Sequence, residues 1–95
     1  MPLQALALLN SEFVRVRAQA FASRLEREEA NEAKRVSAAF LTAYSRPPSR
    51  EEEAAAFGFL DAQDHEYGRV TDARKKAWVD FCQSILMSNE FLYLD

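Results

Sequence analysis

Four residues in one short segment have side chains that bind metal ions or transfer protons in other proteins: Asp61, Asp64, His65 and Glu66. Carboxylate oxygens suit a hard cation such as calcium, but the spacing does not match an EF-hand loop. Charged side chains are mostly solvated rather than buried or ligating. We therefore interpret the segment as a solvated loop and keep these four residues only as weak metal candidates, without predicting a metal site.

Two other features have the residue types of a reaction centre. The acidic run Glu51 to Glu53 contains neighbouring carboxylates, but a catalytic carboxylate pair also needs a pocket that raises one pKa. The acidic run is better explained by its position in the first turn of a helix, where negative side chains interact favourably with the helix dipole. Cys82 lies among apolar neighbours and is predicted to be a buried, inert thiol. No glycine-rich phosphate loop and no haem-attachment motif are present. The sequence predicts no catalytic residue and no cofactor, and it does not favour an enzyme on its own.

Arg46 precedes two prolines at a fixed corner of the chain. A planar guanidinium at such a corner binds carboxylates or helix-end carbonyls with several hydrogen bonds. We expect Glu52 and Glu90 to be its partners. A structural role is favoured over ligand binding, because an Arg beside a helix cap joins two helices.

The composition predicts helices to position these side chains. The chain of 95 residues has only two Gly and three Pro, and Ala, Leu, Glu and Arg dominate it. A short helix carrying Leu3, Leu6 and Leu9 is predicted before a bend at residues 10 and 11. The apolar spacing and the breaks predict four main helices after that bend, at about 12–28, 32–45, 50–63 and 72–88.

Capping residues mark the helix starts. Asn31 is a predicted N-cap, and Ser49 with Glu52 matches a capping box, in which each side chain binds the backbone amide of the other. Thr71 is predicted to cap the last helix, with Asp72 in its first turn. The polar segment 61–70 between the last two helices contains Gly68 and is predicted to be a loop.

The last helix has the broadest apolar face, which includes Trp78 and Phe81, and we expect it to be the central helix. On the first long helix, four charged residues can face water: Arg15, Arg24, Glu28 and Glu29. After a helix end at Ser88 and Asn89, the tail with Phe91 and Tyr93 is expected to be ordered and to fold back on the helices. The expected fold is all-α: residues 1–95 form one compact bundle of four main helices, roughly antiparallel where they adjoin, plus the short N-terminal helix.

Charge and cysteine content limit the partners. Fifteen acidic and twelve basic side chains give a net charge of -3, so no basic face for nucleic acid is evident. A single Cys and a single His do not assemble the usual thiolate and imidazole metal sites. No run of about 18 apolar residues is present, so membrane insertion is not expected.

Three segments resemble, in the right order, the end of the planctomycete PSD1 domain, also called the DUF1553 family: residues 2–14, 35–60 and 77–95. Two shared motifs lie near the start: a leucine-rich Pro-Leu-Gln-Ala-Leu, here residues 2–6, and an Asn before a Phe-Val helix, here Asn10. The third is an Arg-Pro-Pro corner followed by Ser or Thr and paired Glu, here 46–48, Ser49, Glu51 and Glu52. The last is a terminal Asn-Glu-Phe-Leu-Tyr followed by an apolar residue and Asp, here residues 89–95. Ser45 stands where the family often has Gly.

The resemblance implies that the chain is the C-terminal part of a large, exported, multidomain protein, and hence an extracytoplasmic location. It implies no settled activity. We expect a structural or protein-interaction module whose partners are other domains of its own protein or another protein. Two alternatives stay open: an accessory part of an enzyme or electron-transfer assembly whose site lies in other domains, and a homodimerisation module.

Overall fold

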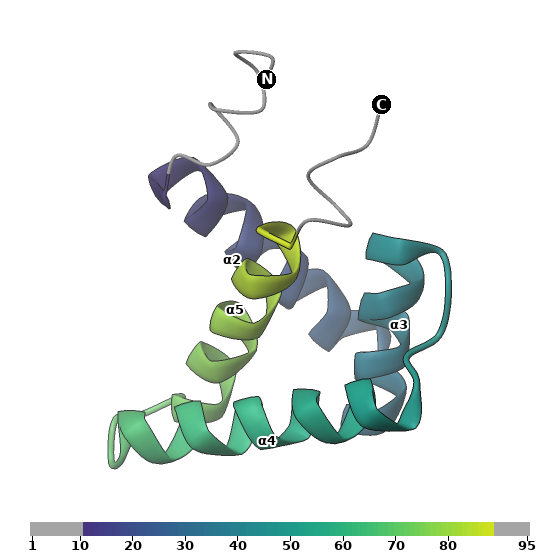
Figure 1. The fold of residues 1–95 in the computed structure, drawn as a ribbon. Coiled ribbons are helices and arrows are strands. Elements are labelled where there is room, and N and C mark those ends of the chain that lie inside the picture. The colour runs from purple at the N-terminus through teal and green to yellow at the C-terminus, as the bar shows by residue number, and fades with distance from the viewer. Residues whose placement is uncertain (1–10, 89–95) are drawn as a thin grey trace.

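The predicted breaks separate four helices in the computed structural model, which describes residues 11–88 (Figure 1). The helices are α2 (Ser11–Glu28), α3 (Glu32–Tyr44), α4 (Arg50–Tyr67) and α5 (Ala73–Leu86), and there is no strand among the described residues. The all-α prediction is therefore confirmed. The short N-terminal helix and the tail with Glu90, Phe91 and Tyr93 were predicted for residues outside the described part.

Helix α5 is the centre of the fold, as its apolar face predicts. It packs most extensively on α4 and on α2, although α2 lies far from it in sequence. Trp78, Phe81, Cys82 and Ile85 are buried in one core cluster with Leu25 of α2 and other residues of all four helices. The prediction of antiparallel neighbours is wrong for α4, which runs at a steep angle to both α3 and α5 (Figure 1).

Local signals place the corner between α3 and α4. Asn31 caps α3 by accepting a hydrogen bond from the Lys34 amide, and Ser49 and Glu52 form the complete capping box of α4. Both predicted caps are confirmed. The α3 helix ends at Ser45, which has left-handed backbone angles (φ 60°, ψ 28°). Glycine adopts this region without steric cost, which is a physical reason for a Gly at this position.

The segment 61–70 is mostly helical, so its prediction as a loop is wrong. Helix α4 continues through Tyr67, and the chain turns only at Gly68, whose φ of 65° and ψ of -119° favour glycine. The polar residues after Asp61 contain no Pro or Gly before that point and tolerate a helix whose outer face is solvated.

The start of α5 also differs from the prediction. Thr71 does not cap it; the N-cap is Asp72, in left-handed geometry (φ 67°) and without a side-chain cap hydrogen bond. The helix ends at Leu86 and not at 88. Since Asp tolerates left-handed backbone angles better than most residues, it can reverse the chain after Gly68.

Candidate functional site

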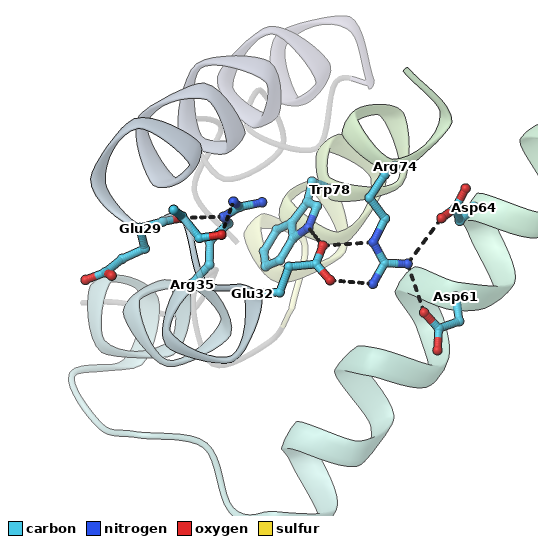
Figure 2. A network of polar contacts seen from close by, with 8 residues as sticks. Glu29, Glu32, Arg35, Asp61, Asp64, Arg74 and Trp78 are labelled. Atoms are coloured by element: carbon cyan, nitrogen blue, oxygen red, sulfur yellow. Dashed lines mark hydrogen bonds and ion pairs between the residues drawn. The ribbon is translucent and has the colours of Figure 1, made fainter. Parts of the chain in front are cut away.

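The side chains of Glu32, Arg74 and Trp78 form the centre of a polar network between α3 and α5 (Figure 2). Arg74 Nη2 donates to Glu32 Oε1 at 2.7 Å and Arg74 Nε donates to Glu32 Oε2 at 2.8 Å. The indole Nε1 of Trp78 donates to Glu32 Oε2 at 2.7 Å. The bidentate geometry makes this a directed ion pair rather than a loose contact.

Two of the weak metal candidates belong to this network. Arg74 Nη1 lies 2.9 Å from Asp61 Oδ1 and 3.4 Å from Asp64 Oδ2, both on α4 (Figure 2). The guanidinium therefore joins three helices through three carboxylates. It lowers the pKa of Glu32 to about 2, and the hydrogen bond to Glu32 is the largest cause of the raised pKa of Arg74.

The other two weak candidates, His65 and Glu66, are exposed near the end of α4. The structure thus splits the four residues: two face Arg74, and two lie on the solvated surface. In the part of the chain that the structure describes, no group of three or more His, Cys, Asp or Glu side chains could hold a metal ion.

Arg35 lies on the other side of the Trp78 ring and is 8% exposed. Its guanidinium carbon lies 4.9 Å from the ring centroid, which is a cation–π distance. Its Nε and Nη2 donate to the carbonyls of Glu29 and Ala30, at 2.8 and 3.2 Å (Figure 2). Arg35 therefore satisfies two carbonyls of the short connection between α2 and α3.

A second network meets at Asp80 of α5. Its Oδ1 accepts from Arg15 of α2 at 2.6 Å, and its Oδ2 accepts from Gln63 and Tyr67 of α4 at 2.9 and 2.7 Å. Burial is the largest single effect and raises the pKa of Asp80, but the three donors together outweigh it and the net pKa is lowered. Arg15, which the sequence allowed to face water, has a side chain that is 37% exposed but reaches across to this carboxylate and also donates to Gln83 at 2.9 Å.

The predicted pair at the proline corner is present. Arg46 donates to both carboxylate oxygens of Glu52, at 2.7 and 3.0 Å, and Glu52 also accepts from the Ser49 amide at 2.9 Å. These contacts, with the bond from Arg46 as the largest cause, lower the pKa of Glu52 to about 2. The Arg46 guanidinium also lies 5.4 Å from the Tyr44 ring centroid and 5.8 Å from that of Phe40. The predicted contact with Glu90 concerns a residue outside the described range.

The other residues considered for a reaction, Cys82 and the acidic run Glu51 to Glu53, lie where the sequence predicted. Cys82 is fully buried, and burial raises the pKa of its thiol to about 12, so a thiolate is disfavoured at neutral pH. Glu51, Glu52 and Glu53 are in the first turn of α4, as predicted. Between residues 11 and 88, every buried side-chain nitrogen or oxygen has a hydrogen-bond partner.

Sequence reasoning missed the two junctions at Glu32 with Arg74 and at Asp80. One signal was available for Asp80: it is a lone carboxylate between Val79 and Phe81, in the helix with the broadest apolar face. Buried charges are almost always paired, so this position itself indicates a cationic partner from another helix. Nothing comparable marks Glu32, which looks like an ordinary acid of a first helical turn.

The fold and these contacts define a small all-helical domain whose charged side chains link its helices. The family model of PSD1, a protein of unknown function (DUF1553), matches residues 1–60, which is more than half of the chain. The chain therefore belongs to the PSD1 family. No curated protein and no solved structure matches it.

Proposed function

We propose that the chain is a structural and protein-interaction module at the C-terminal end of an exported PSD1-family protein, and that it binds other domains of that protein. One observation carries the proposal: the carboxylates and guanidiniums that could do chemistry bind one another between helices. Arg74 joins α3, α4 and α5, and Asp80 joins α2, α4 and α5. Such links hold the helices in one arrangement, as a docking platform requires.

Exposed apolar residues on α2 provide a surface for the partner. Phe13 and Val16, three residues apart on one side of the helix, are 49% and 59% exposed. Apolar side chains that gather on a surface are typical of interaction sites. The proposed partner surface is therefore the side of α2 that carries Phe13 and Val16.

Two further properties concern nucleic acid and membranes as partners. A net charge of -3 does not favour nucleic acid. None of the helices within residues 11–88 is long and apolar enough to cross a membrane. In this proposal the chain is not an enzyme on its own, and any reaction or electron transfer of the whole protein takes place in other domains.

Hydrogen exchange in the full-length protein tests the proposal. The amides around Val16 should exchange more slowly in the full-length protein than in the isolated chain, and Val16→Asp should abolish the difference. Val70→Asp is the matched control, because Val70 is similarly exposed, at 50%, but lies in the turn before α5. Equal exchange in both proteins, or equal effects of both substitutions, would argue against the proposal.

Light scattering of the isolated chain separates this proposal from homodimerisation. We expect the mass of a monomer at all concentrations, because the partner surface is proposed to fit a different domain. A mass that doubles with rising concentration, and that returns to the monomer value in Val16→Asp, would instead favour the homodimer.

A further inference from the structure

A groove lined by both apolar and cationic side chains lies where α2, α3 and the end of α5 meet. Its volume is about 260 Å³, and its lining includes Phe21 of α2, Ala43 of α3 and Leu86 of α5. Small-molecule sites are usually about 300 to 1,000 Å³. The size of the groove therefore suits a few side chains of a peptide segment better than a free small molecule.

Two arginines of α2 stand beside this apolar lining. Arg24 lies over the Phe21 ring, 5.7 Å from its centroid. Its other contacts are long: an ion pair of 3.7 Å with Glu28, and a hydrogen bond of 3.4 Å that it donates to the Thr42 hydroxyl. Arg17 also lines the groove and has no ion pair with any residue between 11 and 88. Aromatic and aliphatic carbons beside two guanidiniums fit a segment that carries both aromatic and acidic side chains.

The chain has such a segment directly after α5. Residues 89–95 read Asn-Glu-Phe-Leu-Tyr-Leu-Asp. In an extended segment, alternate residues face the same side, so Phe91, Tyr93 and Asp95 form one side and Glu90 lies on the other. One side thus combines two aromatic rings with a carboxylate, which matches the lining of the groove.

The attachment point of this segment is next to the groove. Leu86 lines it, and two residues later the Ser88 hydroxyl lies 2.8 Å from the Tyr44 hydroxyl, which fixes the end of α5 on α3. The seven residues after Ser88 span at most about 23 to 25 Å when extended. The stretch of α2 from Arg17 to Arg24 is about 10 Å long at 1.5 Å per residue, so it lies within reach.

We propose that residues 89–95 bind in this groove, with Phe91 and Tyr93 against Phe21 and Leu86, and with Asp95 at Arg17 and Arg24. In this arrangement Glu90 faces away from the groove. The inference does not depend on the proposed function, because it concerns the chain's own tail and not its partner.

A second apolar groove near the end of α5 fits the tail less well. It lies between α3, α4 and α5, is lined by Tyr44, Phe59 and Ile85, and also has a volume of about 260 Å³. Its charged lining residue is Glu52, whose carboxylate is already paired with Arg46, whereas two guanidiniums line the first groove. Charge complementarity therefore favours the groove with the two arginines.

A charge exchange in the full chain tests the proposal. Arg17→Glu and Asp95→Lys should each lower the melting temperature by about 2 to 4 °C, as expected for a partly exposed ion pair in a domain of this size. The double variant should regain most of the loss, because the pair is restored with reversed charges. Arg27→Glu is the control: Arg27 is an exposed arginine of the same helix that does not line the groove, and it should show no coupling to Asp95→Lys.

Nuclear Overhauser contacts in the unmodified chain provide a second measurement that does not depend on variant stability. The Tyr93 ring should contact the methyl groups of Leu86 and Ala43 at every protein concentration. Contacts of Tyr93 with Phe59 would overturn the proposal by placing the tail in the second groove. Contacts that appear only at high concentration would overturn it by placing the tail on another copy, and so would an absence of both coupling and contacts.

Discussion

Glu32 illustrates what a carboxylate does in this protein at the scale of one residue. It accepts three hydrogen bonds, two from Arg74 and one from Trp78, while its side chain remains 31% exposed. The pair with Arg74 is the largest cause of its lowered pKa, about 2 against an ordinary 4.5. Between these two pH values the unfolded chain holds a proton on Glu32 that the folded chain does not. The contribution of the ionised Glu32 to the free energy of unfolding is therefore complete above pH 4.5 and is lost as the pH falls toward 2.

The first prediction concerns Glu32→Gln and acid stability. The pKa change corresponds to at most about 3 kcal/mol, and solvent screening of this partly exposed group reduces it to about 1 to 2 kcal/mol. The variant should be less stable than the parent by that amount at pH 7, and the difference should shrink between pH 4.5 and 2. Urea unfolding at a series of pH values measures both curves. Glu66→Gln, at an exposed position, is the control; parallel curves for Glu32→Gln and the parent would contradict the assignment.

The second prediction concerns Asp80→Asn. An amide of the same shape loses the charge that binds Arg15 and replaces one acceptor oxygen by a donor, so at least one of the three donors around position 80 loses its partner. We expect a loss of about 1 to 3 kcal/mol in the free energy of unfolding, measured by urea denaturation at pH 7.

Asp72→Asn is the matched control for Asp80→Asn. Asp72 is exposed, makes no side-chain cap hydrogen bond and has left-handed backbone angles that Asn adopts readily. The control should be nearly neutral. Equal effects of the two substitutions would show that the junction at Asp80 adds nothing to stability.

At the scale of the helices, the sequence predicted the features that depend only on residues close together in the chain, such as helix caps. Asn31 and the Ser49–Glu52 box were found because a cap depends on residues three positions apart. The end of α4 was missed because polarity was read as a loop signal, whereas helix formation through Tyr67 is stabilised by Gln63 and Tyr67 binding Asp80, more than ten residues away.

The third prediction compares two hydroxyl residues that sequence reasoning treats alike. Ser49→Ala should cost about 1 kcal/mol, because the Ser49 hydroxyl accepts from the Glu52 amide at 3.1 Å. Thr71→Ala should cost little, because Thr71 is not the cap of α5. Thermal unfolding followed by circular dichroism measures both, and a loss for Thr71→Ala as large as for Ser49→Ala would contradict the observed start of α5.

The fourth prediction concerns the end of α3. Ser45→Gly should raise the free energy of unfolding by about 0.5 to 1 kcal/mol, because glycine has no steric cost at φ 60° while the gain is partly offset by a freer unfolded chain. Ser37→Gly, within the same helix, is the control and should lower stability by about 0.5 to 1 kcal/mol. If both substitutions destabilise the protein, Ser45 does not have left-handed geometry in solution.

At the scale of the whole molecule, the sequence predicted the helices and the central position of α5 but not the contacts that join them. The hydrogen bond from Arg74 to Glu32 spans 42 residues, and that from Arg15 to Asp80 spans 65. No periodicity within one helix specifies such pairs, because they depend on how the helices cross. The steep crossing of α4 was missed for the same reason (Figure 1).

The fifth prediction uses Cys82 to report on the whole fold. Its side chain is fully buried in the core of α5, and the raised pKa of the thiol, about 12, further limits the reactive thiolate. A thiol reagent should therefore modify Cys82 only when the domain opens. With a stability of at least about 5 kcal/mol, typical of small domains, labelling should be several thousand times slower than in the unfolded chain.

Variants at Asp80 and Glu32 decide whether Cys82 is exposed by unfolding of the whole domain or by local opening. If the domain opens as one unit, Asp80→Asn and Glu32→Gln should speed labelling by the factor that their urea unfolding gives, although Glu32 contacts only the first turns of α5. A control labelling in the parent at rising urea should follow the same dependence as global unfolding. Local opening would give a different result: labelling would be faster than global unfolding, and it would respond to Asp80→Asn but not to Glu32→Gln. That result would show that the second half of α5 separates from α2 and α4 while its first half stays bound to α3.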